Sequence, residues 1–398
     1  MLILVLSILS GIFIGILTGI IPTLHPNNIT TLILLYSAFL LQKINVYPLI
    51  AFIIALTTTH SFTSFLASIL FGVPEEDTAL SVLPSHQLLM DGKGLYALYL
   101  TVVGGILSIL ITLSLLPIFF VILKPLYKIS IESLPYLLLL SLLLLILKSE
   151  NKLYTTLIVI LSGALGYIIL NVYFLHSFQK LTAMFAGLFG ASLLVKSLIQ
   201  NVSRLPPQET KIFSGKWDIS SAFLGVLSSF LVILLPSLSP SQAITMVSSI
   251  KELDAESYLV SLGSLTTADA ILSFLSLWLV NNPRSGSSIA VQGLLGSLDL
   301  NTFIFCLAVF LIASAVASLL TLLVGKKIIS VVEKINYKKL NLSLLLFVFL
   351  FIFVTSGLYG VLILVTSTAL GIICDELGVN RSMLVSSLMI PTIISFLL

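Results

Sequence analysis

The chain has 398 residues, of which 58% are hydrophobic and 9% are charged, and its formal net charge is +3. A soluble domain carries about a quarter charged residues, so this composition excludes an ordinary water-exposed surface, and no nucleic-acid partner is expected. The sequence has no glycine-rich phosphate loop with a lysine, which excludes an ATP-driven pump. Cys306 and Cys374 lie far apart in apolar sequence, so we expect free buried thiols and no metal site.

Apolar segments recur from Leu2 to Leu397. About 20 apolar residues are needed to cross a hydrocarbon core. The chain has roughly ten to twelve hydrophobic segments, and several of them are shorter than this. The first segment has no basic residues before it and no small-residue cleavage pattern, so we expect a retained helix and not a signal peptide. The sequence therefore predicts an all-α, polytopic integral membrane protein surrounded by membrane lipid.

The first apolar segment ends in a frame of two prolines four residues apart, Pro22-Thr23-Leu24-His25-Pro26, and the frame returns as Pro236-Ser237-Leu238-Ser239-Pro240. Two prolines at this spacing break a helix twice within about one turn. Unwound backbone at membrane depth survives only where protein or a water-filled cavity satisfies its polar groups. Secondary transporters build binding sites at the bilayer midplane from such broken helices.

Amide and hydroxyl side chains follow each break, Asn27 and Asn28 in the first copy and Ser241 and Gln242 in the second. They are expected to open a half-helix whose free N–H groups and positive dipole end attract an anion. The alternative is a kinked helix whose caps hold no ligand. His25 is either a proton carrier or anion ligand, or a hydrogen-bonded structural residue. The second copy has a serine in its place, so symmetry does not require a histidine.

Two polar clusters, residues 57–64 and 71–78, are separated by a short apolar segment, and residues 79–90 are too few to cross a membrane. The spacing predicts a re-entrant hairpin with its tip near residues 72–78. Three acids at the tip either hold a cation or a proton, or are solvated charges in the first turn of a helix. These acids are Glu75, Glu76 and Asp77.

A hydroxyl-rich segment of the second half ends in Thr266-Thr267-Ala268-Asp269, followed by an apolar run. An acid at membrane depth is costly and points to function. Neighbouring hydroxyls and carbonyls suit Na⁺, and the carboxylate alone serves H⁺; the alternative is a structural ion pair with Arg284. Arg284, followed by Ser285, stands where the other half has its acidic tip. Its forked guanidinium suits a carboxylate or a phosphate.

The two halves follow the same order of broken helix, short helix, hairpin-like pair, long helix, basic loop and closing spans. Residues 162–166 (Ser-Gly-Ala-Leu-Gly) are echoed by residues 356–360 (Ser-Gly-Leu-Tyr-Gly). We therefore predict a first transmembrane repeat over residues 1–200, a polar linker over 201–217 and a second repeat over 218–398. Equivalent loops are basic in both halves, so charge does not settle their orientation. Inverted repeats are preferred by analogy with other transporters.

The chain resembles the large membrane subunit of the tripartite tricarboxylate transporters, in its archaeal branch. That family carries a Pro-Gly-Leu-Gly-Pro signature twice, with a Gly-x-Pro segment and later Thr and Asp-Gly residues between the copies. The frames at 22–26 and 236–240, Gly72-Val73-Pro74 and Asp91-Gly92 are similar to these, although Thr, His and Ser replace the signature glycines. The resemblance implies ion-coupled transport of an organic anion across a prokaryotic cell membrane. It also implies a small membrane subunit and a binding protein as partners.

These observations predict a secondary active transporter for a carboxylate-type organic anion, with Na⁺ or H⁺ as coupling ion and no other cofactor, as a monomer or homodimer. The predicted substrate-binding residues are Pro22, Thr23, His25, Pro26, Asn27, Asn28, Ser64, Thr78, Pro236, Ser237, Ser239, Pro240, Ser241, Gln242, Arg284 and Ser285. The predicted ion-coupling residues are Glu75, Glu76, Asp77, Thr266, Thr267 and Asp269. Two alternatives stay open. One is a flippase for a phosphate-bearing lipid carrier, and the other is an intramembrane lipid-modifying enzyme with His25, His60 or His86 beside acids.

Overall fold

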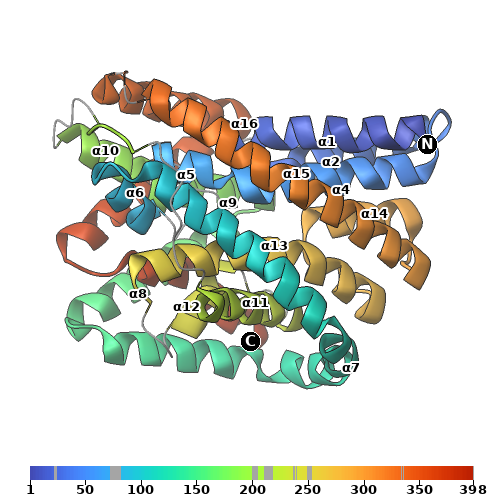
Figure 1. Ribbon diagram of the computed structural model, residues 1–398. Helices are drawn as coiled ribbons and strands as arrows, with labels where there is room; N and C mark the ends of the chain where they lie inside the picture. Colours follow the sequence, from blue (N-terminus) through green and yellow to red (C-terminus); the bar gives the residue numbers. More distant parts are fainter. Residues whose placement is uncertain are drawn as a thin grey trace.

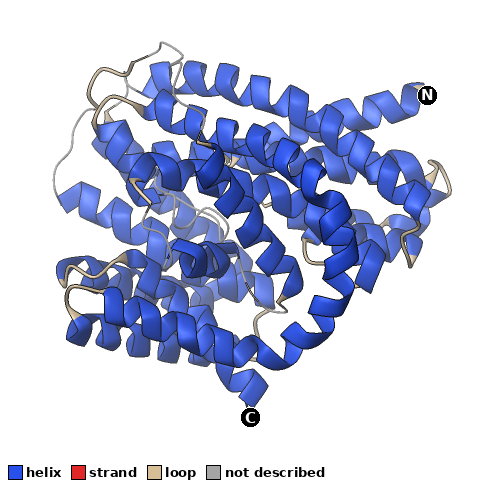
Figure 2. Ribbon diagram, turned by 60° about the horizontal axis from the view of Figure 1, so that its bottom comes forward, coloured by secondary structure: helices blue, strands red, loops and turns tan. Residues whose placement is uncertain are grey.

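The structure is a computed structural model, in which the described residues are 1–21, 25–71, 82–199, 205–209, 218–235, 238, 240–248, 253–332, 334 and 336–397. Within these ranges every regular element is a helix, and no strand occurs (Figure 2). Eight helices are long and apolar enough to cross a membrane, and four shorter apolar helices of 10–17 residues accompany them. The predicted all-α polytopic architecture is confirmed.

In the first half a break follows α1, and the last two elements are the π-helical segment η2 and the helix α10. They are α1 (Leu2–Ile20), α2 (Pro26–Leu35), α3 (Ser37–Leu41), α4 (Val46–Thr63), α5 (Phe65–Phe71), α6 (Val82–Met90), α7 (Gly94–Lys148), α8 (Lys152–Leu170), α9 (Ser177–Phe185), η2 (Ala186–Ala191) and α10 (Ser192–Ile199). Those of the second half are α11 (Ile219–Leu234), α12 (Pro240–Ser248), α13 (Ala255–Val280), α14 (Gly286–Leu295), α15 (Leu300–Val332), α16 (Tyr337–Glu376), the 3₁₀-helix η3 (Arg381–Val385) and α17 (Ser386–Leu397).

The polar clusters at residues 57–64 and 261–269 lie inside long helices. Residues 57–64 belong to the span Val46–Leu70, and residues 261–269 belong to α13; both spans are mostly buried. The reason is local, because many hydroxyls in these clusters donate to carbonyls of their own helix, as Thr57 does to Ile53 at 2.9 Å. The predicted hairpin tip at residues 72–78 lies outside the described residues.

Glycines allow α1 to lie directly against α4. A Cβ atom on Gly11, Gly15 or Gly19 would collide with α4, at Ala55, Thr59 and Thr63 in turn. Each step of four residues on α1 matches four residues on α4, so the two helices are parallel. The chain between them, which includes α2 and α3, therefore returns to the side from which α1 started. In the second half α11 and α13 have the same relation, because the Ser261 hydroxyl donates to the Ser221 carbonyl at 2.8 Å and the Ser257 hydroxyl donates to Asp218 at 3.0 Å.

Each half also packs against long helices of the other half. Helix α4 of the first half contacts α15 of the second half, with the ring centroids of Tyr47 and Phe305 5.2 Å apart. Helix α13 of the second half contacts α7 of the first half, and the Tyr96 hydroxyl of α7 donates to Glu256 of α13 at 2.8 Å. The closing helices are paired in the same way, α8 with α17 and α16 with η2. In Figure 1, α5 follows α4 toward the left and α14 follows α13 toward the right, so α4 and α13 run in opposite directions.

Two helices are too long for a single crossing. The 55 residues of α7 would extend about 80 Å if straight, but the helix contains Pro117, Pro125 and Pro135 and turns back along the lower edge of the molecule (Figure 1). The 40 residues of α16 are broken at Gly357, whose φ of 63° is open to glycine but strained for other residues. Each bend changes the direction of a helix that would otherwise be longer than the hydrocarbon core is thick.

Described residues of the linker are fixed to the turn between α6 and α7. The Gln208 amide donates to the Leu89 carbonyl at 2.9 Å and its oxygen accepts from the Gly94 N–H at 3.0 Å. The Glu209 N–H donates to the Gly92 carbonyl at 2.8 Å. This part of the connection is therefore packed against the first half of the molecule.

A buried ion pair joins the closing helices of the two halves. Arg381, 3% exposed, donates to both oxygens of Asp375 at 2.7 and 2.6 Å, and Lys196 from α10 contacts the same carboxylate at 3.1 Å. Arg381 also donates to the Leu188 carbonyl of the π-helix at 3.4 Å and to the Ser192 hydroxyl at 3.0 Å. The widened turn of a π-helix leaves carbonyls unpaired, and the Arg381 guanidinium donates a hydrogen bond to one of them.

Candidate functional site

The first proline break ends at His25, which caps the following half-helix. The Nδ1 atom of His25 accepts a hydrogen bond from the Asn27 N–H at 3.1 Å, and α2 begins at Pro26, whose missing N–H is no loss there. Thr30 is buried and donates to the Asn27 carbonyl at 3.1 Å. The predicted half-helix after the break is therefore present, with a histidine as its cap.

A third break, between α13 and α14, lies beside this one. Ser285 caps α14 in a capping box with Ser288: the Ser285 hydroxyl accepts from the Ser288 N–H at 3.2 Å, and the Ser288 hydroxyl accepts from the Ser285 N–H at 3.0 Å. The Ser273 hydroxyl of α13 lies 2.9 Å from both of these hydroxyls. Ser287 adds another hydroxyl 2.9 Å from Ser285. The start of α14 is thus a cluster of buried and half-buried hydroxyls.

The half-helices α2 and α14 lie side by side with their N-termini together. A Cβ on Gly286 would overlap the side-chain amide of Asn27, and a Cβ on Gly293 would lie 2.7 Å from Leu34. The second pair is seven residues further along both helices, so α2 and α14 are parallel. Two helix N-termini, each with free N–H groups and a partial positive charge, therefore open at the same place.

Arg284 connects this place to the second proline break. Its guanidinium donates to the carbonyls at the C-terminal end of α11, to Val232 at 3.0 and 2.7 Å and to Leu235 at 2.8 Å. A weaker contact of 3.4 Å reaches the Leu238 carbonyl inside the proline frame. These carbonyls lack partners within α11 because the helix ends there. Residues 284–286 thus contact the start of α2 on one side and the end of α11 on the other.

A second histidine faces the first break from α4. His60 is buried, and its ring centroid lies 5.3 Å from that of His25. Its Nδ1 lies 3.0 Å from the Thr18 hydroxyl, which can also donate to the Gly15 carbonyl at 3.0 Å. His60 is close to the middle of the span Val46–Leu70.

Three of the residues predicted to couple ions, Thr266, Thr267 and Asp269, lie among the described residues of α13. Asp269 is half-buried on α13, one turn before Ser273, and close enough to Arg284 for an electrostatic interaction. The Thr266 hydroxyl donates to the Gly263 carbonyl of its own helix at 3.2 Å. Thr267 lies on the opposite face of α13 from Asp269 and packs near Gly105 of α7. Thr266 and Asp269 are three residues apart and share the face of α13 that carries Ser273, so these two are on the side of the third break.

The other predicted residues are placed as follows. Ser64 is buried one turn beyond His60, and Ser241 is buried in the first turn of α12, where its carbonyl accepts from the Thr245 hydroxyl at 2.7 Å. Pro240 begins α12, and Asn28 and Gln242 belong to the first turns of α2 and α12. Nine predicted residues lie outside the described residues: Pro22, Thr23, Glu75, Glu76, Asp77, Thr78, Pro236, Ser237 and Ser239.

Sequence reasoning did not assign His60, Ser273 or Ser288 to the site. The glycines at 11, 15 and 19 facing a residue series four apart on α4 are the signal that could have placed Thr18 beside His60. Among the described residues, no three His, Cys, Asp or Glu side chains come together to hold a metal ion, and both cysteines are buried. No described cluster of histidines with acids favours the intramembrane-enzyme alternative.

The family of the chain follows from comparison with known proteins. Residues 5–386 match the model of the tripartite tricarboxylate transporter TctA family. The chain belongs to the TctA family. It is also similar to an uncharacterized protein of Methanocaldococcus jannaschii, 31% identical over 402 residues that cover 98% of each chain. No solved structure matches the chain.

Membership of the TctA family confirms the resemblance inferred from the proline frames. With its eight candidate spans, the chain is a multi-pass membrane protein of a transporter family, which agrees with the prediction that it is not an enzyme. A tripartite transporter family implies partner subunits and an anionic substrate.

Proposed function

We propose that this TctA protein is a secondary active transporter that binds a carboxylate-bearing organic anion where the N-termini of α2 and α14 meet. The observation that carries the proposal is the parallel alignment of these half-helices, with Asn27 against Gly286 at their starts. Each N-terminus contributes about half a positive charge, so two together favour a ligand with more than one negative charge. A tricarboxylate, the substrate class in the family's name, has that property.

Arg284 increases the preference for an anion. Its guanidinium stays charged at all physiological pH values and is held by the carbonyls of Val232 and Leu235. Positive charge in a low-dielectric interior is costly unless it is compensated, and a bound carboxylate offsets that cost. The Asn27 amide and the hydroxyls of Ser285 and Ser287 supply neutral donors at the same point.

For the coupling ion we propose H⁺, bound by His25 and His60. The Thr18 hydroxyl can donate to a bare Nδ1 of His60 or accept from a protonated one, because its own proton has the Gly15 carbonyl as another acceptor. Both protonation states of His60 are therefore satisfied. Two imidazolium charges with ring centroids 5.3 Å apart would repel each other, so we propose one transported proton for the pair. That proton and the anion favour each other's binding, as coupled transport requires.

The test reconstitutes the full chain, with its partner subunits, in proteoliposomes and measures uptake of labelled citrate. We expect an inward proton gradient to drive accumulation. His60→Gln should abolish accumulation while preserving citrate counterflow, which needs the anion site but no ion gradient. The matched control is His176→Gln, because His176 is an exposed histidine.

Two outcomes would contradict the proposals separately. If Na⁺ drives uptake, and Asp269→Asn abolishes it while His60→Gln does not, the coupling ion is Na⁺ at Asp269. If the wild-type protein shows neither uptake nor counterflow of tri- or dicarboxylates but moves a phosphate-bearing lipid, the flippase alternative replaces the anion transporter.

We further propose that residues 1–200 and 218–398 are inverted repeats joined by the linker 201–217. The exchanged pairing of α4 with α15 and α13 with α7, together with the opposite directions of α4 and α13, supports this arrangement (Figure 1). The test places single cysteines at Lys43 and Asp254, just before α4 and α13, in a chain with Cys306 and Cys374 replaced by alanine. A membrane-impermeant thiol reagent should label the two positions from opposite sides. Labelling from the same side would exclude inversion.

A further inference from the structure

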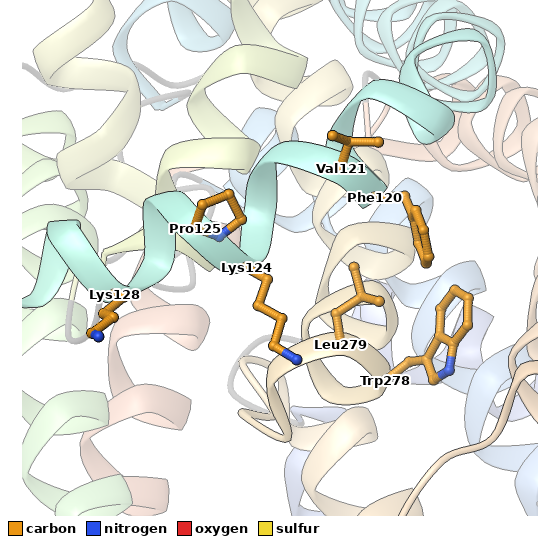
Figure 3. A pocket seen from close by; sticks show the side chains of 7 residues that line it. All are labelled: Phe120, Val121, Lys124, Pro125, Lys128, Trp278 and Leu279. Atoms are coloured by element: carbon orange, nitrogen blue, oxygen red, sulfur yellow. The ribbon is translucent and has the colours of Figure 1, made fainter.

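A groove of about 780 Å³ lies between α7 and the C-terminal end of α13, just before the third break. Phe120, Val121, Lys124 and Lys128 of α7 line it together with Trp278 and Leu279 of α13. Figure 3 shows the Lys124 side chain extending toward Leu279 and Trp278, with Lys128 one turn further along α7. The lining thus combines two cations and no acid with an apolar wall.

The groove is at the end of a membrane span. Lys124 and Lys128 lie within the last two turns of the span Gly94–Ser130, on either side of Pro125. Two lysines at the end of a span favour the edge of the hydrocarbon core, because a charge inside the core is costly. Tryptophan and lysine are the residues that gather at this boundary. The polar part of the groove therefore faces the level of lipid headgroups.

The apolar wall of the groove is a rigid surface open to the surroundings. Val121 is 68% exposed and Phe120 is 46% exposed. The Trp278 ring is held between Phe120 at 5.4 Å and Phe303 at 5.0 Å, centroid to centroid. Two lysines one helical turn apart can both reach one phosphate group, and an acyl chain can lie along Val121 and Phe120. A soluble anion would use the lysines and leave the apolar wall uncovered.

We propose that this groove binds an anionic phospholipid, with the phosphate between Lys124 and Lys128 and an acyl chain against Phe120, Val121 and Trp278. The occupant follows from charge complementarity and from the position of the groove at the membrane boundary. Because Trp278 lies nine residues beyond Asp269 on α13, the lipid stabilises the end of the helix that leads into the third break. The proposal does not depend on the identity of the transported anion.

The test uses fluorescence of the full chain in detergent micelles. The protein has two tryptophans, so Trp217→Phe leaves Trp278 as the only fluorophore of that kind. Phosphatidylglycerol with brominated acyl chains should quench Trp278 saturably, and at lower concentration than brominated phosphatidylcholine. Lys124→Gln with Lys128→Gln should weaken phosphatidylglycerol binding by about thirtyfold, and either single change by about fivefold, from about 1 kcal/mol per charge. The matched control, Lys326→Gln with Lys327→Gln on α15, should leave the titration unchanged.

Three results would overturn the proposal. Equal quenching by both lipids would show that the lysines select no charge, and an equal loss in the control pair would show a general charge effect. Displacement of the brominated lipid by inorganic phosphate alone would assign the groove to a soluble anion. Should the double variant not fold, the fivefold shift of each single variant gives the same decision.

Discussion

Replacing Gly286 with alanine perturbs the point where the two half-helices meet. The added Cβ would overlap the side-chain amide of Asn27, so that amide must rotate away from the proposed anion site. Removal of one hydrogen bond to a charged ligand costs about 1.5–3 kcal/mol, which corresponds to about ten- to 150-fold in Kd. Isothermal titration of the detergent-solubilised protein with citrate measures this loss directly.

The reasoning assigns the effect to Asn27, and a double-mutant cycle tests that assignment. Asn27→Ala alone should cause a similar loss, and Gly286→Ala added to it should cause little more, because the space is already vacated. Gly293→Ala is the matched control on the same pair of helices. Its Cβ meets only the flexible end of Leu34 at 2.7 Å, so affinity should stay within about twofold. Wild-type affinity in Gly286→Ala, or an equal loss in Gly293→Ala, would refute the role given to the helix starts.

Two further predictions concern stability, each measured by unfolding in detergent micelles. Asp375→Asn leaves the 3%-exposed Arg381 without its carboxylate, so we expect the free energy of unfolding to fall by about 3–5 kcal/mol. The double variant Arg381→Met with Asp375→Leu removes both charges and should recover this stability. No recovery would mean that the charges themselves matter little. Burial raises the pKa of the Asp218 carboxyl, but hydrogen bonds from Ser221, Ser220 and Ser257 outweigh it and lower the pKa to about 2. Because this folded value lies below the unfolded value of about 3.9, the stabilisation by Asp218 is complete above about pH 4 and is lost as the pH falls toward 2. Asp218→Ala should reduce that acid sensitivity and cost about 1 kcal/mol at neutral pH as a lost helix cap; an unchanged stability profile between pH 2 and 5 would contradict the role of this carboxylate.

The start of the half-helices could be predicted because proline acts locally. Pro26 and Pro240 begin α2 and α12 as expected from the two frames, since proline fits the first turn of a helix and disrupts its interior. The hydroxyl clusters were misjudged for the same local reason. A serine or threonine can break a helix or donate to its carbonyls, and the sequence does not show which; in α4 and α13 most of them donate to carbonyls of the same or a neighbouring helix.

Long-range contacts explain the remaining differences. Arg284 was predicted to bind an anion, and the contacts that hold its guanidinium, to the carbonyls of Val232 and Leu235, come from 52 and 49 residues away. Asp269, Thr266 and Thr267 are neighbours in sequence, yet the 100° turn per residue of a helix puts Thr267 on the opposite face. The His25–His60 pair depends on the glycine-mediated approach of α1 to α4 and has no counterpart in local spacing.

Composition alone determined that this chain is an integral membrane protein, because 9% charged residues cannot cover a water-exposed surface. The paired proline frames determined where its helices break and, through the family they signal, the class of transporter. Only the tertiary structure decided which breaks meet. The parallel packing of α2 on α14, and of α1 on α4, brings two helix N-termini, Arg284 and two histidines to one depth. Hydrophobic and proline patterns act over one or two turns, whereas a binding site is made by contacts between segments hundreds of residues apart.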